Sequence, residues 1–445
     1  MIETLIPLSF GDFPDDVQLC VLSFLRPADL AAFACTCKRF DALYRHDQRL
    51  WFSLCHRRWG SKTLINKWGG GKISYKHLYR VLHEYDTLIG FWRRCGDAAA
   101  SAPPLVFFEW GPFYITGSRV SPSKNRGYGV IKKPYLWMSI APSGEMINYL
   151  DPDGKAELTA EDLMAESGVV ESELIQVNVN FIGDCHVVVE ENLGVSTNGS
   201  ATDPSSPDLR GEECDNVYGS PPDRLMTEIY QCLANRTSPG GNGSSRRQRR
   251  REKEKQKQGR MRKWDPEHFV KIVNCSPKPS RPLQGLWKGI CDDMSLDFYL
   301  VSYDDVGGIA CRKVGDSYRP LTYHAPIFWT SSLTFFESPL SPEEDDIYHC
   351  RSHLRPAAEA DESHDHISAS DNGVVSHMLY INSSYDLVIP DLVGTTVNPR
   401  RVEGRIWQYR NGTFGFGFLR DNYIIDLKHI AVNGHLLDTV EPSNG

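Results

Sequence analysis

The sequence predicts an α+β fold in which a small N-terminal helical unit precedes a large antiparallel β domain, barrel-like and interrupted by two disordered insertions. Apolar residues recur at helical spacing near the start of the chain. The later parts are rich in β-branched and aromatic residues separated by turn sequences, which favours strands. Two stretches consist instead mainly of small, polar and charged residues, and they hold too few apolar side chains to offset the entropy of ordering.

These changes in composition place the boundaries of the parts. The predicted parts are a helical unit (8–56), a helical connector (57–87), the first strands of the β domain (88–191), a disordered basic insertion (192–262), further strands (283–336 and 377–440) and a disordered acidic and histidine-rich insertion (337–376). In a chain of 445 residues, 40% hydrophobic and 11% aromatic content is enough for a substantial core. We therefore expect a globular protein with two or three domains.

The helical unit begins at Pro14, a residue that the first turn of a helix tolerates. The apolar residues that follow lie on one face of a helix, four, seven and eight positions after the first of them: Val17, Val21, Phe24 and Leu25. A second start signal, Pro27 with Asp29, leads into another apolar stripe at helical spacing. The two stripes predict a helical hairpin.

Helices this short have only marginal stability when isolated, so their apolar face must be buried against another surface. The helical unit could rest on the remainder of its own chain, or it could bind a partner. Periodicity alone does not decide between these two alternatives.

The same residues resemble the F-box, the adaptor-binding motif of SCF (Skp–cullin–F-box) ubiquitin ligases. The matching elements, in order, are Phe13-Pro14, Val21-Leu22, Phe24-Leu25, Pro27, Asp29-Leu30, Cys37-Lys38, Phe40 and Leu50-Trp51. The chain departs from the usual pattern at Phe13, where the family has leucine, and at Ala34, where a larger aliphatic residue is common. The resemblance implies that a Skp-type adaptor, and through it a cullin, binds at Pro14, Val17, Val21, Leu22, Phe24, Leu25 and Leu30.

The β segments contain a short internal echo. Gly90-Phe-Trp92 and Gly285-Leu-Trp287 share the glycine, the tryptophan, an apolar residue two positions earlier and a basic residue afterwards, and Gly404-Arg-Ile-Trp407 is a weaker copy. Gly-x-Trp near a strand start resembles the closing strand of lipocalin-type barrels, although ordinary core tryptophans would give the same letters. The many strands without matching long helices favour a closed or strongly curved antiparallel barrel. The order of parts is also similar to F-box only protein 31 and to plant F-box proteins with a β-rich C-terminal domain.

Charge and cysteine usage limit the partners and the compartment. A net charge of −8 does not favour a surface built for nucleic acid, and the basic run over 246–263 is open to interpretation as an import signal, a solvated linker or a phosphate contact. Twelve cysteines without a signal peptide fit a reducing compartment, so we expect no disulfides and a location in the cytoplasm, the nucleus or both. No stretch is apolar enough for a transmembrane helix, and we expect no membrane partner.

No motif predicts catalysis, a cofactor or a metal. The candidate zinc ligands His349, Cys350, His353, His364 and His366 match no standard spacing. Asp151-Pro-Asp-Gly154 fails the ligand pattern of a calcium loop and is typical of a turn. No nucleophile elbow, phosphate loop or dinucleotide fingerprint occurs.

The sequence thus predicts a non-catalytic substrate-recognition subunit of an SCF-type E3 ubiquitin ligase, which binds the adaptor through the F-box and a target protein through the β domain. The residues that bind the target are unknown. The alternative is a β-barrel that binds a small ligand or a peptide in its mouth, with the helical segment as a lid.

Overall fold

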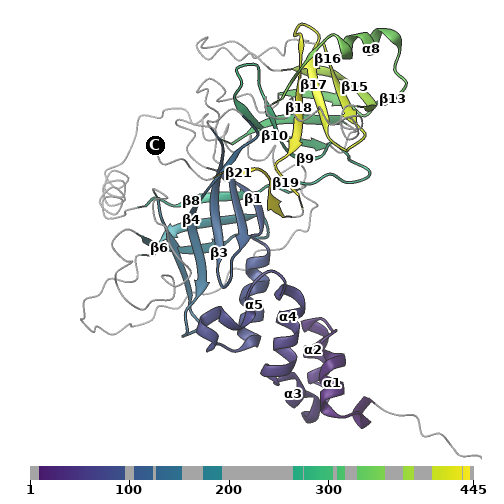
Figure 1. Cartoon of the computed structure of the whole chain (residues 1–445). Helices are drawn as coiled ribbons and strands as arrows, with labels where there is room; N and C mark the ends of the chain where they lie inside the picture. Colours follow the sequence, from purple (N-terminus) through teal and green to yellow (C-terminus); the bar gives the residue numbers. More distant parts are fainter. Residues whose placement is uncertain are drawn as a thin grey trace, which may run out of the picture. The chain divides into compact units, whose positions relative to one another are not determined.

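A computed structural model describes eleven segments of the chain: 10–95, 105–123, 127–152, 174–192, 264–273, 275–303, 308–315, 328–355, 374–384, 403–432 and 434–440. The chain divides into two units, one formed by Met1–Glu191 with Pro266–Gly445 and the other by Asn192–Asp265. All elements named below belong to the first unit (Figure 1). The predicted basic insertion lies almost wholly outside the described residues.

Five α-helices precede the strands: α1 (Asp15–Leu22), α2 (Pro27–Ala34), α3 (Lys38–Tyr44), α4 (Phe52–Trp59) and α5 (Tyr75–Asp86), joined in places by the short helical turns η1 (Phe10–Asp12), η2 (Asp47–Trp51) and η3 (Ile65–Gly71). Both predicted helix starts are present, since Pro14 caps α1 and Pro27 is the first residue of α2. Helix α4 runs across the predicted boundary between the F-box and the connector, and Trp51 packs edge-on against Tyr79 of α5 at 5.6 Å. The F-box and the connector therefore share one core.

The first sheet is an eight-stranded antiparallel ring. Its strands are β1 (Gly90–Cys95), β2 (Leu105–Trp110), β3 (Ile115–Pro122), β4 (Val130–Ile140), β5 (Met146–Leu150), β6 (Ile175–Phe181), β7 (His186–Glu191) and β8 (Glu267–Lys271). The order β4-β3-β2-β1-β8-β7-β6-β5 is closed by the pairing of β4 with β5. The predicted barrel is thus confirmed, and its last strand follows the basic insertion, where the sequence pattern predicted no strand.

The second sheet is also an eight-stranded ring. Its strands are β9 (Gly285–Ile290), β10 (Leu296–Tyr303), β11 (Gly308–Val314), β12 (Trp329–Ser332), β15 (Val375–Ser384), β16 (Gly404–Tyr409), β17 (Phe414–Phe418) and β18 (Tyr423–His429). Pairing of β12 with β15 closes this ring, and two short strands, β13 (Phe336–Glu337) and β14 (Ser352–Leu354), pair with β15 and β18. A layer of buried apolar side chains joins the two barrels. It includes Phe91 and Phe107 of the first ring and Leu286 and Phe298 of the second.

The Gly-x-Trp echo marks the first strand of each ring. The indole N–H of Trp92 donates to the carbonyl of Leu88 at 2.5 Å, and that of Trp287 donates to the carbonyl of Leu283 at 2.9 Å. Both glycines have positive φ, which an L side chain rarely adopts. The third copy is different, since Trp407 packs in a separate cluster with Tyr348. The echo is therefore a structural repeat in two places and a coincidence in the third.

Part of the predicted acidic insertion is ordered, which contradicts the expectation of disorder for those residues. Helix α8 (Pro342–His349) and strand β14 lie inside 337–376. Ser341 is the N-cap of this helix, because its hydroxyl accepts a hydrogen bond from the backbone N–H of Glu344 at 3.3 Å. Tyr348 anchors α8 in an apolar cluster with Trp407 and Ile424. Residues 356–373 lie outside the described part of the chain.

The C-terminal segment ties the barrels together. Strand β21 (Thr439–Val440) comes after the second ring but pairs in parallel with β4 of the first. Beside it, the ammonium group of Lys288 is fully buried and donates to Tyr128 O at 3.0 Å, Leu437 O at 3.0 Å and Asp438 Oδ2 at 2.7 Å. Lys288 is the basic residue that follows the second Gly-x-Trp element.

We predict that Lys288→Met destabilises the chain by about 1–3 kcal/mol, because it leaves buried acceptors without a donor. The backbone amides of Thr439 and Val440 should also exchange faster with deuterium. Urea unfolding and hydrogen exchange measure the two effects. Lys132→Met is the matched control, since Lys132 is 32% exposed and makes one ion pair, to Glu109 at 2.6 Å. Equal losses in both variants would contradict a special role for Lys288.

Candidate functional site

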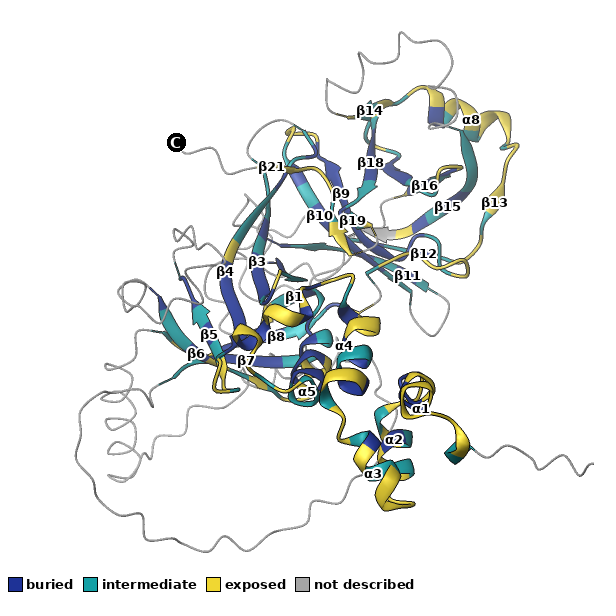
Figure 2. Cartoon of the chain, turned by 60° about the horizontal axis from the view of Figure 1, so that its bottom comes forward, coloured by how far each residue is buried: buried dark blue, intermediate teal, exposed yellow. Residues whose placement is uncertain are grey.

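The first helices present a row of exposed apolar side chains. The exposed fractions are 40% for Phe13, 39% for Val17, 48% for Val21, 71% for Phe24 and 37% for Leu25. Figure 2 shows α1 mainly in the colour of exposed residues. Contiguous exposed apolar residues of this kind mark interaction surfaces in soluble proteins. We call these five residues the apolar row.

The predicted adaptor-binding residues fall into two groups. Pro14 is exposed with the apolar row, whereas Leu22 is 2% exposed and Leu30 is 1% exposed, so both leucines belong to the core of the helical unit. Contact of an adaptor with any of the seven residues stays a prediction. In this chain, however, Leu22 and Leu30 are buried within the helical unit and are not part of its exposed surface.

The segment that carries Phe13 is held in place by polar contacts. The Gln18 amide donates to Phe13 O at 2.6 Å, and the Arg39 guanidinium donates to Gly11 O at 2.7 Å. Phe10 adds an edge contact to Phe33 at 5.7 Å between ring centroids. The start of the apolar row is therefore fixed by the helices behind it.

Arg57 of α4 fixes the other end of the row. Its guanidinium carbon lies 3.8 Å from the centroid of the Phe24 ring, a cation–π contact. The same guanidinium donates to Ser23 O and, at 2.5 Å, to Ser23 Oγ, just past the C-terminus of α1. Nothing in the local sequence pattern singled out Arg57, because it is more than thirty residues away from Phe24. The contact holds the most exposed ring of the row in one orientation.

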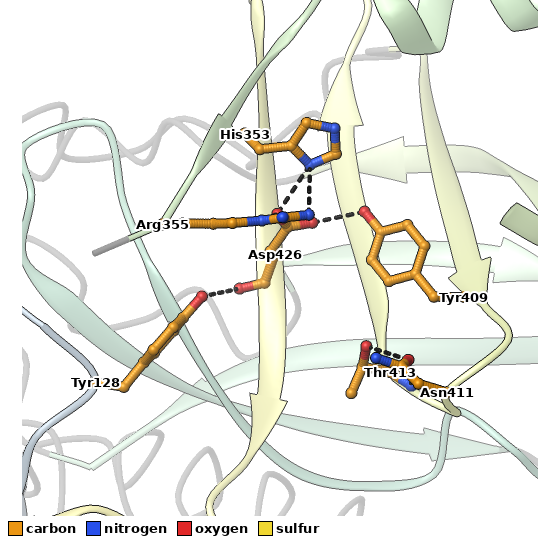
Figure 3. Close-up of polar contacts among 7 residues, drawn as sticks. All are labelled: Tyr128, His353, Arg355, Tyr409, Asn411, Thr413 and Asp426. Atoms are coloured by element: carbon orange, nitrogen blue, oxygen red, sulfur yellow. Dashed lines mark hydrogen bonds and ion pairs between the residues drawn. The ribbon is translucent and has the colours of Figure 1, made fainter. Parts of the chain in front are cut away.

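A polar site lies on the second barrel around Asp426 of β18 (Figure 3). Its carboxylate accepts a hydrogen bond from Tyr409 OH at 2.5 Å and from Arg355 Nε at 2.5 Å, and His353 Nδ1 lies 2.8 Å from Oδ2. Tyr128 of the first barrel donates to the main-chain carbonyl of Asp426 at 3.4 Å. Strand β14, which carries His353 and leads to Arg355, is thereby fixed to β18.

The Asp426 site is an anchoring site. Burial by itself raises the pKa of Asp426, but the His353 and Arg355 donors outweigh it and the net pKa is lowered. Burial, and then the Asp426 charge, raises the pKa of Tyr409, which therefore keeps its proton and donates it. With three donors on a single carboxylate, the role that the geometry supports is to hold β14 against the barrel.

The histidines and the cysteine considered as candidate zinc ligands do not come together within the described part of the chain. His353 is committed to Asp426, and His349 of α8 lies 3.5 Å from Asp345. His364 and His366 lie outside the described part of the chain. Within that part, no group of three or more histidine, cysteine or acidic side chains is placed to hold a metal ion. No described helix is long and apolar enough to cross a membrane.

The chain belongs to the F-box protein family. A family model described as F-box-like matches residues 10–57, the stretch from η1 to α4 that carries the apolar row. The relative that shows the family is F-box protein At3g12350 of Arabidopsis thaliana, which is 47% identical over 437 residues, with 98% of each chain covered. The resemblance seen in the sequence is confirmed.

We predict that Asp426→Asn destabilises the chain by about 1.5–3 kcal/mol at neutral pH, because charge-assisted hydrogen bonds are lost. The folded-state pKa of Asp426 is below its unfolded value, so its contribution is present above about pH 4 and is lost as the pH falls through the folded pKa. The variant should therefore converge with the wild type below about pH 4. Urea unfolding from pH 7 to 3 measures this, and a difference independent of pH would contradict it.

Proposed function

We propose that this F-box protein is the substrate-recognition subunit of an SCF-type E3 ubiquitin ligase. The F-box would bind a Skp-type adaptor, and through it a cullin, while the β barrels hold a target protein. The observation that carries the proposal is the apolar row, which stays exposed in a matched F-box although Leu19, Leu22 and Leu30 of the same helices are buried. A surface of this kind is expected to be buried by a partner.

The proposed contribution to ubiquitin transfer is proximity. A receptor that holds its target beside the ubiquitin-charged enzyme makes the transfer effectively intramolecular, and it needs no catalytic residue of its own. Because α4 and α5 share their core with the F-box and also contact the first barrel, the target would be held at a defined place relative to the adaptor.

The proposed location is the cytoplasm, the nucleus or both. Nine cysteines in the described residues are free thiols, and three of them, Cys20, Cys35 and Cys37, are exposed on the F-box. Exposed thiols of this kind fit a reducing compartment.

We predict that Val21→Asp combined with Phe24→Asp lowers adaptor affinity by about a hundredfold or more, because each charge would be buried in an apolar interface. Both side chains are exposed in the free chain, so its fold should survive. The measurement is co-purification with a Skp-type adaptor, followed by titration calorimetry. Ile182→Asp is the matched control, since Ile182 is 60% exposed but lies beyond β6 on the first barrel. Full adaptor yield with the double variant would show that the proposal is wrong.

We predict that Arg57→Ala weakens adaptor binding by about three- to tenfold, because the ring of Phe24 loses its cation–π partner and its fixed orientation. Arg57→Lys keeps the cation and should recover part of the loss. Titration calorimetry against the adaptor compares the two variants. If Arg57→Lys and Arg57→Ala lower the adaptor affinity equally, the cation–π contact with Phe24 does not contribute to binding.

A further inference from the structure

The helical connector contacts one end of the first barrel. Thr63 Oγ1 donates to the carbonyls of Gly111 and Pro112 at 2.8 Å each, in the turn between β2 and β3. His77 of α5 lies 2.9 Å from the carbonyl of Gly144, in the turn between β4 and β5. Both turns are at the same end of the ring, whose elements can be followed in Figure 1. The connector therefore packs against this end of the ring.

Charged side chains point into the barrel toward the opposite end. Phe91 faces the second barrel, so its neighbour Trp92 faces inward. The register places Val106 opposite Trp92 and Arg119 opposite Val106, and paired residues share a face. Arg94, two residues after Trp92, faces inward as well. Both arginines therefore stand on the inner face of the ring, and the Arg94 side chain is 48% exposed.

Only one of these two guanidinium groups has a carboxylate partner. Arg94 pairs at 3.0 Å with Glu267, which is 5% exposed. Arg119 donates to the carbonyl of Pro152 at 3.0 Å and stacks 4.7 Å from the centroid of the Tyr135 ring, and it makes no ion pair with any described residue. The register places Lys133 and Glu191 on the same face, and both are already engaged in an interaction. Among the described residues, Arg119 is thus the arginine of this pair that has no carboxylate partner.

A buried donor without a partner lies beside the Arg119 guanidinium. Tyr135 is 2% exposed, and its hydroxyl has no hydrogen-bond partner among the described residues. Burial, and then the charge of Glu267, raises the pKa of Tyr135, so the hydroxyl keeps its proton. Leaving such a group unpaired is costly, and native proteins rarely do so away from a functional site.

The interior of the second barrel also holds an ion pair, between Lys313 and Asp297 at 2.6 Å, but there the buried Tyr299 hydroxyl lies 3.3 Å from Cys291 Sγ and so has a partner. Large apolar side chains fill its interior, among them Trp287, Tyr299, Trp329, Phe414 and Phe416. The two interiors therefore differ in one respect: the buried Tyr299 hydroxyl of the second barrel has a partner, whereas the buried Tyr135 hydroxyl of the first has none among the described residues.

We propose that Arg119 and Tyr135 bind a carboxylate of the target protein inside the first barrel. This inference rests on the proposed function, and it names the chemical group of the target protein that the barrel binds. A carboxylate accepts hydrogen bonds from a guanidinium and a phenol, and its single charge matches that of the Arg119 guanidinium. A phosphate dianion fits less well, because Glu267 lies in the same cluster and would repel the second charge. The carboxylate could come from an acidic side chain or from a free chain end.

Three small probes test the site on the full-length chain by saturation-transfer NMR. N-acetyl-glutamate α-amide represents the side chain, N-acetyl-glycylglycine represents the chain end, and methyl phosphate represents the dianion. At least one carboxylate probe should bind saturably, and whichever binds more tightly identifies the source. Tyr135→Phe should lower that affinity by about tenfold, and Arg119→Gln should lower it further.

Stability measurements and a control variant separate a loss of probe binding from a loss of folding. Tyr135→Phe removes only an unpaired hydroxyl, so its thermal stability without probe should equal or exceed that of the wild type. Lys132→Gln, on the outer face of β4, is the control and should leave probe binding unchanged. The proposal is overturned if neither carboxylate binds, if methyl phosphate binds more tightly, or if both site variants bind the probes like the wild type. Adaptor co-purification measured in parallel separates these outcomes from a failure of the proposed function.

Discussion

Closure of each β-sheet into a ring is the constraint on which the remainder of this structure depends. A closed ring of eight strands leaves no strand at a free edge, and alternate side chains along each strand point into the ring. In both rings the first strand carries a tryptophan whose N–H donates to the carbonyl four residues earlier. The outer faces that remain apolar pack against each other, and Lys288 with the C-terminal strand holds that contact together.

The same constraint explains how the helical region is positioned. The connector does not merely link the F-box to the barrels, because its side chains satisfy carbonyl groups in the turns at one end of the first ring. The F-box in turn shares buried aromatic residues with the connector. The apolar row is therefore presented by a continuous series of packed contacts, which suits the proposed role of holding an adaptor and a target in a fixed relation.

The two polar clusters of the barrels differ in how fully they are satisfied. Asp426 accepts three donors, and the result is the anchoring of an inserted helix and strand. Tyr135 lies in an equally buried place with its hydroxyl unpaired by the described residues, beside an arginine without a carboxylate. Complete satisfaction is typical of a structural role, whereas the proposed carboxylate site rests on the unpaired Tyr135 hydroxyl together with the Arg119 guanidinium beside it.

Local patterns in the sequence determined the helix starts at Pro14 and Pro27, the exposed face of Val17 and Val21, and the β character of the later segments, because helical and strand periods are short-range properties. The N-cap residue Ser341 is also a local signal, but it lies within a polar stretch whose composition predicts disorder. Only the tertiary structure decided that there are two rings, that Leu22 is buried, and that Arg57, Asp426 and Tyr135 meet their neighbours. Those features depend on pairings between residues far apart in the chain, which the spacing of nearby residues does not encode.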